Sequence, residues 1–214
     1  FGPELLKDYA RAMAIYYPVT IAYFFIFFFI YAYYGGGMPG VKRFFKFIIT
    51  PAITSLATQS SIATLPVNLE ATKQIGIPRD VREIVLPMGA TMHMDGSCLS
   101  AILKISFLFG IYGKDFAGFG TFATAIIIAV MSGVVMSGIP GGGLIGEMLI
   151  VSLYGFPAEA FPIIATIGFL VDPPATMVNS TGDSVAAMMV TRLVEGKDWL
   201  RKVMDKEADG QFVE

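Results

Sequence analysis

The chain has 214 residues, of which 55% are hydrophobic and only 15% are charged, whereas a typical soluble domain carries about 25% charged residues. This composition predicts an integral membrane protein and excludes a disordered chain or a soluble coiled coil. The net charge of −2, without a basic stripe, argues against nucleic-acid binding. The single cysteine, Cys98, excludes an internal disulfide framework.

The first long apolar stretch, residues 16–34, is long enough to span a bilayer as a helix. Its six tyrosines suit the two membrane interfaces. We expect the glycine-rich stretch 35–40 to end this helix. Residues 1–40 therefore form the first predicted transmembrane unit.

Residues 41–78 are predicted to form a re-entrant hairpin. The apolar stretch 44–58 is too short to span a bilayer. The stretch 58–66 is small and rich in hydroxyl groups, which suits a hairpin tip rather than a helix interior. Residues 67–74 would then return to the same side of the membrane.

Residues 79–113 form the second predicted spanning unit, and residues 92–96 (MHMDG) interrupt its apolar stretch. A polar interruption at membrane depth fits a broken helix that lines a protein cavity. In residues 114–157 the sequence at 137–143 is rich in Gly and Pro and separates two apolar limbs. We expect this segment to be a second re-entrant hairpin.

Residues 158–194 form a third spanning unit, also predicted to be broken, here at 172–174 and 179–183. The tail 195–214 is charged and is expected to be solvated. The organisation thus repeats, because a short hairpin precedes an interrupted spanning helix twice. Paired interrupted segments indicate the central binding site of a transporter.

Positive charge is distributed unevenly along this topology. If both hairpins are re-entrant, 11 of the 15 Lys and Arg residues fall on one side, namely those at 42, 43, 46, 73, 79, 82, 192, 197, 201, 202 and 206. The positive-inside rule then predicts a multi-pass protein of the inner or plasma membrane with a cytoplasmic C-terminus.

Ionisable side chains deep in a membrane are functional candidates, and here they are His93, Asp95, Lys104, Glu147, Asp172 and Asp183. Lys104 and Glu147 are candidates for an ion pair, although no spacing argument establishes it. A buried histidine satisfied by hydrogen bonds is the alternative to a functional His93. One His and one Cys are too few for a zinc site.

Asp172, Asn179 and Asp183 are spaced seven and four residues apart, which places them on one face of a helix. Such an acceptor-rich face suits Na⁺; the alternative is a structural polar cluster between helices. Ser60 and Ser61 lie where free backbone N–H groups at a helix end would bind a carboxylate. The alternative for these serines is a simple turn.

The chain contains four linked strings: SSIATLP (60–66), LPMGATMHMDG (86–96), GIPGGG (138–143) and MVNSTGD (177–183). Together they resemble the dicarboxylate/amino acid:cation symporter family, which includes glutamate and aspartate transporters. The resemblance covers nearly the whole chain but only the C-terminal half of the family's fold. It implies an all-α transport core with two re-entrant hairpins and two broken transmembrane helices, in a fold that is a homotrimer at full length.

The resemblance also implies site residues. The substrate pocket would comprise Ser60, Ser61, Ser97, Ile139, Gly143, Asp172, Thr176 and Asn179. Asn179 and the backbone at 60–61 would hold the substrate carboxylate, and Asp172 would hold the amino group. Na⁺ would bind at three sites: Gly89, Asn179 and Asp183; Thr91 with backbone at Gly133, Val134 and Met136; and Asp95 beside His93.

Three departures from the family pattern bear on function. Ala175 stands where members with acidic substrates have an Arg, so a side-chain carboxylate would lose its bidentate partner. His93 replaces an Asn, from which we hypothesise a weakened or partly proton-coupled third cation site. Lys104 could stand in for a counter-transported cation.

The sequence therefore predicts a symporter, not an enzyme, that couples Na⁺ or H⁺ to uptake of a small neutral amino acid by alternating access. An acidic amino acid or C4-dicarboxylate is the alternative substrate. The chain could also be an inactive transporter fragment, or an intramembrane serine protease built on Ser137 and His93.

Overall fold

The chain folds as a bundle of helices around one long central helix, α8. The computed structural model describes residues 3–138 and 140–210. In chain order the helices are α1 (Pro3–Phe47), α2 (Ile49–Thr58), α3 (Ser61–Ile75), α4 (Arg79–Met92), α5 (Asp95–Ile111), α6 (Phe119–Met136), α7 (Gly143–Tyr154), α8 (Ala160–Glu195) and α9 (Trp199–Ala208). Four helical stretches are long and apolar enough to cross a membrane: Glu4–Phe47, Arg79–Ile111, Phe119–Met136 and Ala160–Glu195. These helices confirm the expected all-α architecture of a membrane protein.

Helix α1 consists of two helical runs joined by a kink. Gly36 and Gly37 leave helical geometry, so the first run ends in the expected glycine-rich stretch, and the second run continues as far as Phe47. Pro39 has no N–H to donate to the carbonyl of Gly35, four residues earlier. The indole Nε1 of Trp199 donates to that carbonyl instead, at 2.7 Å. The α9 segment thus satisfies the backbone at the kink.

The first hairpin, α2–α3, has a much shorter tip than expected. Only Gln59, in the left-handed conformation (φ 50°), and Ser60 separate the two helices. The Ser60 hydroxyl accepts a hydrogen bond from Ala63 N at 3.2 Å and so caps α3. The prediction that 61–66 would be non-helical is wrong, because this cap starts the helix at Ser61.

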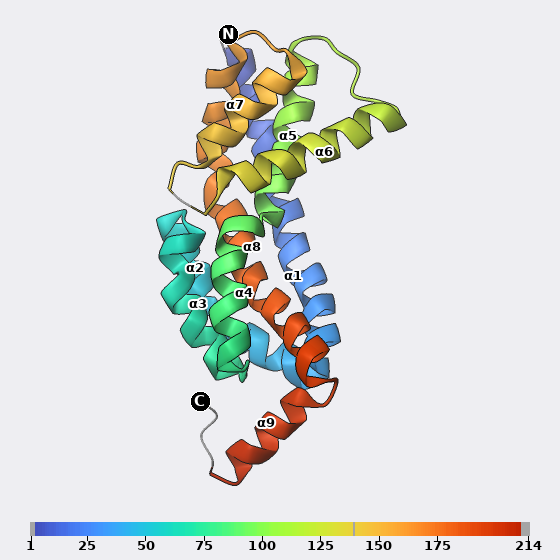
Figure 1. The fold of residues 1–214 in the computed structure, drawn as a ribbon. Coiled ribbons are helices and arrows are strands. Elements are labelled where there is room, and N and C mark those ends of the chain that lie inside the picture. The colour runs from blue at the N-terminus through green and yellow to red at the C-terminus, as the bar shows by residue number, and fades with distance from the viewer. Residues whose placement is uncertain (1–2, 139, 211–214) are drawn as a thin grey trace.

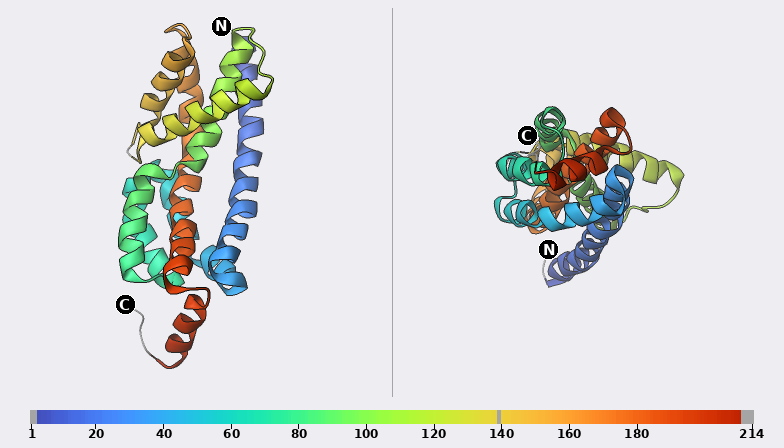
Figure 2. Two further views of the ribbon diagram at one scale, coloured as in Figure 1. Left: turned by 45° about the vertical axis from the view of Figure 1, so that its right-hand side comes forward. Right: turned by 90° about the horizontal axis from the view of Figure 1, so that it is seen from below.

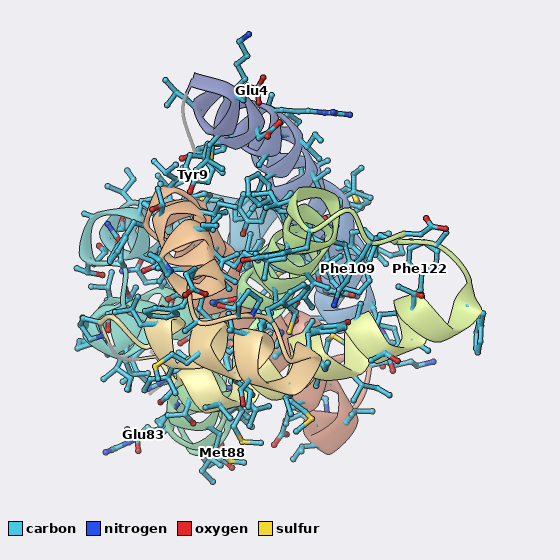
Figure 3. All side chains as sticks on the ribbon, turned by 90° about the horizontal axis from the view of Figure 1, so that it is seen from above. Glu4, Tyr9, Glu83, Met88, Phe109 and Phe122 are labelled. Carbon is cyan, nitrogen blue, oxygen red and sulfur yellow. The ribbon has the colours of Figure 1, made fainter. Side chains whose placement is uncertain are left out.

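The helical break between α4 and α5 falls at His93 and Met94, inside the predicted interruption. The second hairpin, α6–α7, turns at about the same height (Figure 1). Figure 2 shows the α2–α3 hairpin in one half of the molecule and the α6–α7 hairpin in the other half. Seen from above, the part of α6 near Phe122 projects beyond the other helices (Figure 3). The two hairpin turns and the α4–α5 break therefore meet at mid-height.

Helix α8 runs unbroken from Ala160 to Glu195, so the breaks predicted at 172–174 and 179–183 are wrong. Pro174 cannot donate to the carbonyl of Leu170, but the Tyr17 hydroxyl does, at 2.9 Å. Gly182 does not break the helix but lets His93 pack closely against α8, since a Cβ at this position would lie only 2.9 Å from Nδ1 of His93. One of the two expected broken helices is therefore continuous.

Of the three apolar cores in the described residues, a small one contains Tyr16, Ile167, Val171 and Ala175, and the two larger ones lie on either side of the mid-height polar layer. The lower one contains buried residues such as Phe28, Phe44 and Met188. The upper one contains Ile105 and Ile150, among others. Polar side chains at mid-height are thus enclosed by hydrocarbon above and below.

The segments that carry the eleven cations of the predicted cytoplasmic side share one end of the bundle, together with α9 (Figure 1). There Arg43 forms an ion pair with Glu207 at 2.8 Å. The adjacent guanidinium holds the pKa of the Glu207 carboxyl below its ordinary value. The opposite end carries the start of α1 and the loop between α5 and α6.

We predict that Tyr17→Phe lowers the free energy of unfolding by about 1 kcal/mol, the usual net contribution of one hydrogen bond. The change removes the only hydroxyl that contacts the proline-freed carbonyl of Leu170 in the described residues. Thermal unfolding in detergent measures the effect. The exposed Tyr33→Phe is the matched control, and equal stability of the two variants would contradict this account of the unbroken helix.

Candidate functional site

A buried amide holds the start of α5 against α8. Oδ1 of Asn179 accepts from Gly96 N at 2.8 Å and from Ser97 N at 3.2 Å, and its Nδ2 donates to Ser97 Oγ at 2.8 Å. The N–H groups that begin a helix have no intrahelical partner. Asn179 therefore caps α5 from a neighbouring helix, and the α4–α5 break makes this cap possible.

Asp172 lies seven residues before Asn179, on the same face of α8. The Thr176 hydroxyl donates a hydrogen bond to Oδ1 of Asp172 at 3.3 Å. Two small cavities of about 30 and 20 Å³ adjoin this carboxylate. Both are lined by Ser97, Met136, Gly143 and Asp172. Each cavity has room for about one water molecule, which is less than an amino acid needs.

The N-terminus of α3 faces the second hairpin. Ser60 Oγ donates to the carbonyl oxygen of Gly138 at 2.7 Å, and the backbone N of Ile62 reaches the same oxygen at 3.2 Å. These two donors lie next to the backbone N–H groups of Ser60 and Ser61 that were expected to bind a carboxylate. The contact joins the two hairpin tips directly.

An imidazole links two carboxylates beside this cap. His93 Nδ1 lies 3.2 Å from Oδ1 of Asp183, and its Nε2 lies 3.2 Å from Oδ2 of Asp95. The Tyr23 hydroxyl donates to the same Asp95 oxygen at 2.6 Å. Each ring nitrogen of His93 thus lies against a carboxylate, and Tyr23 is a site residue that the sequence did not reveal.

Asp183 is the best-placed cation ligand of the first expected Na⁺ site. It is 1% exposed, and its Oδ2 has no hydrogen-bond partner among the described residues. Gly89 lies against it, since a Cβ on Gly89 would lie 3.2 Å from Asp183 Cβ. The side chain of Asn179 is turned toward α5 instead, so the third expected ligand contributes no side-chain oxygen there.

The second expected Na⁺ site is only partly assembled. The Thr91 hydroxyl donates to Met88 O of its own helix at 2.9 Å. Gly133, Val134 and Met136 lie in the last turn of α6, where carbonyl oxygens lack intrahelical donors. Such carbonyls suit a cation, but nothing in the described structure brings Thr91 against them.

Lys104 and Glu147, the candidates for an ion pair, do form one between α5 and α7, with Nζ 2.7 Å from Oε1. They are 2% and 1% exposed. Both line the larger of the two cavities that adjoin Asp172.

The structure brings together most of the expected substrate residues: Ser61, Ser97, Gly143, Asp172, Thr176 and Asn179 line the two cavities. Ile139 lies outside the described residues. A further buried amide was missed: Asn68 donates to the carbonyl of Ser180 at 2.6 Å and to its hydroxyl at 2.9 Å. An asparagine within an apolar helix was the signal that could have revealed it.

A serine-protease arrangement needs a base within hydrogen-bond reach of the nucleophile. Both ring nitrogens of His93 contact carboxylates, and Ser137 is not among its partners in the described residues. The geometry gives this hypothesis no support.

We predict that Gly138→Ala separates the two hairpin tips. A Cβ there would lie 3.1 Å from Ser61 Cβ and would overlap the Ala90 carbonyl, so we expect a loss of about 1–3 kcal/mol of stability in thermal unfolding. Gly120→Ala, in open space on α6, is the control. A variant as stable as wild type would show that the tips do not pack as described.

Comparison with known proteins identifies the family. The model of the sodium:dicarboxylate symporter family matches residues 1–193. Human excitatory amino acid transporter 2 is 35% identical over 151 residues, and rat neutral amino acid transporter B(0) is 30% identical over 154 residues. These matches cover 70% and 72% of this chain but only 26% and 28% of the relatives, so the chain spans about a quarter of their length. The chain belongs to the sodium:dicarboxylate symporter family.

Proposed function

We propose that this chain forms the binding core of a symporter that couples Na⁺ to uptake of a small neutral amino acid. The family is one of transporters, not enzymes. The observation that carries the proposal is the pair of small cavities beside Asp172, of which one is lined by both hairpins and the other by hairpin α6–α7. Irregular backbone at membrane depth, lined by polar groups, is the usual site of a transported solute.

In this proposal each end of the amino acid has a partner. The donors at Ser60 and Ser61, with the Asn179 amide, bind the α-carboxylate once the Gly138 carbonyl has moved away. Asp172 binds the α-amino group. Hairpin α6–α7 acts as the gate, because the α3 donors cannot serve Gly138 and substrate at once.

The preference for a neutral side chain rests on Ala175, which offers no guanidinium to a second carboxylate. An acidic amino acid or dicarboxylate is the second candidate, because several similar relatives are excitatory amino acid transporters. Ligand-dependent unfolding, described below, separates the two.

Na⁺ binds, in this proposal, near Gly89 and Asp183 and at the C-terminal carbonyls of α6, with Asp95 and His93 as a further site. The buried, unpartnered oxygen of Asp183 supports the first of these. Coupling arises if Na⁺ and amino acid both favour the same closed conformation, because a ligand shifts an equilibrium only by its differential affinity.

The protein is proposed to lie in the inner or plasma membrane with its C-terminus in the cytoplasm. The cation-rich end of the bundle supports this orientation. Large exposed side chains such as Phe25 and Ile26 would face lipid or a neighbouring helix. Trimer formation is proposed only for the full family fold, and an inactive fragment remains the alternative for this chain on its own.

We predict that Na⁺ together with a neutral amino acid stabilises the purified protein in detergent. Linkage gives about 2.7 kcal/mol at a ligand concentration 100 times the dissociation constant. Thermal unfolding with serine, alanine, cystine or aspartate, each in Na⁺ or K⁺, measures the effect. Asp172→Asn should abolish the shift, whereas Asp115→Asn, on an exposed loop, should keep it.

A shift with aspartate alone would favour the acidic substrate. A shift that is equal in Na⁺ and K⁺ would contradict Na⁺ coupling. No shift with any ligand would favour the inactive fragment.

We also predict that His93→Asn lowers the Na⁺ concentration needed for half of the stabilisation by about threefold or more, because two imidazole hydrogen bonds no longer compete for Asp95 and Asp183. Na⁺ titration of the unfolding temperature, with K⁺ as the reference, measures it. An unchanged or weakened Na⁺ dependence would show that His93 does not compete with the cation.

A further inference from the structure

The Lys104–Glu147 ion pair has no part in the proposed binding of the amino acid or of Na⁺. Its two charges lie 2.7 Å apart and are almost completely removed from solvent. A buried pair of this kind is seldom retained for stability, because desolvation offsets most of the attraction. Paired charges inside a membrane domain are more often found along a substrate pathway.

The position of the pair relative to Asp172 is informative. The smaller cavity is lined by Ser61, Asp172 and Asn179, which are among the groups proposed for the two charged ends of the amino acid. The larger cavity is lined by Lys104 and Glu147. Since both cavities adjoin Asp172, a substrate anchored at its α-amino group can extend its side chain from one into the other.

Helix geometry agrees with this arrangement. Ser97 lines both cavities, and Lys104 lies seven residues further along α5 on the same face. Seven residues advance a helix by about 10 Å. Because the flexible Lys104 side chain covers part of that distance, a side chain of a few methylenes could reach the pair.

The carboxylate of Glu147 still has an unused acceptor. Oε1 accepts a hydrogen bond from the Lys104 ammonium, whereas Oε2 is buried without a hydrogen-bond partner among the described residues. Gly168 of α8 makes room for this carboxylate, since a Cβ there would lie 2.9 Å from Glu147 Cδ. A buried acceptor without a donor is unfavourable, and a substrate N–H or O–H would satisfy it.

We propose that the Lys104–Glu147 pair selects the substrate side chain by charge, in favour of a neutral side chain that ends in a hydrogen-bond donor. Among the described residues, Lys104 is the only cation that lines the larger cavity, and Glu147 neutralises it. The Oε2 atom of Glu147 is then free to accept a hydrogen bond from the substrate side chain. A side-chain carboxylate would meet a like charge there and no free ammonium. This inference rests on the proposed function and names the substrate class more closely.

Glutamine and glutamate test the proposal, because they have the same shape and differ in the donor and the charge. Binding to the purified protein in Na⁺ is measured by ligand-dependent thermal stabilisation. Wild-type protein should prefer glutamine. In Glu147→Gln the Lys104 ammonium loses its counter-charge and can pair with the side-chain carboxylate of glutamate. The ratio of glutamate affinity to glutamine affinity should therefore rise by about tenfold or more.

Two further variants make the result specific. Glu83→Gln is the same substitution at an exposed ion pair on α4 and should leave the preference unchanged. Lys104→Met/Glu147→Gln removes both charges, so its preference should shift toward glutamate by much less than that of Glu147→Gln. If Glu147→Gln fails to fold, this double variant decides, and a shift of about tenfold or more without the ammonium would overturn the proposal.

An unchanged preference in Glu147→Gln would show that the pair only joins α5 to α7. Wild-type protein that responds to alanine but not to glutamine would also overturn the inference, while the proposed function would stand. If no amino acid stabilises wild-type protein, the proposed function itself fails, and the inference fails with it.

Discussion

The rest of the structure depends on one constraint: an uninterrupted helix carries polar side chains through the interior of a membrane protein. Asp172, Asn179 and Asp183 lie along α8, with hydrocarbon cores above and below them. Buried polar groups without partners cost free energy. Helices α3 and α5 therefore begin, and hairpin α6–α7 turns, at the level of these side chains.

The irregular backbone of the molecule can be understood from this requirement. The α4–α5 break supplies two N–H groups to Asn179 and positions His93 between two carboxylates. The hairpin tips hydrogen-bond to each other through Gly138. Elements that surround a site by such contacts can also exchange them for contacts with a ligand, which is what a gate requires.

Much of the architecture could be predicted from the sequence, because glycine, proline and charge interrupt apolar stretches at definite places. The break at His93 and the two hairpins follow from this pattern. The continuity of α8 could not be predicted, because Pro173 and Pro174 favour a break and the hydroxyl that reaches the carbonyl freed by Pro174 comes from the distant Tyr17. The hydrogen bond from Trp199 to the kinked backbone at Gly35 was likewise not predictable, because Trp199 is far away along the chain.

The site was predictable as a set of residues but not as a set of contacts. The spacing of Asp172, Asn179 and Asp183 indicated one polar face, and α8 has that face. Spacing gave no information on tertiary partners, so Tyr23 and Asn68 were missed. The pairing of Lys104 with Glu147 depends on how α7 packs against α5, which local sequence does not encode.

The central claim is that Na⁺ and a neutral amino acid bind to the same closed conformation. The most direct test is calorimetric titration of the amino acid at low and at high Na⁺, with K⁺ holding the ionic strength constant. The account predicts that affinity rises with Na⁺ and, by reciprocity, that the amino acid raises Na⁺ affinity by the same factor. An amino-acid affinity that is independent of Na⁺ would contradict it.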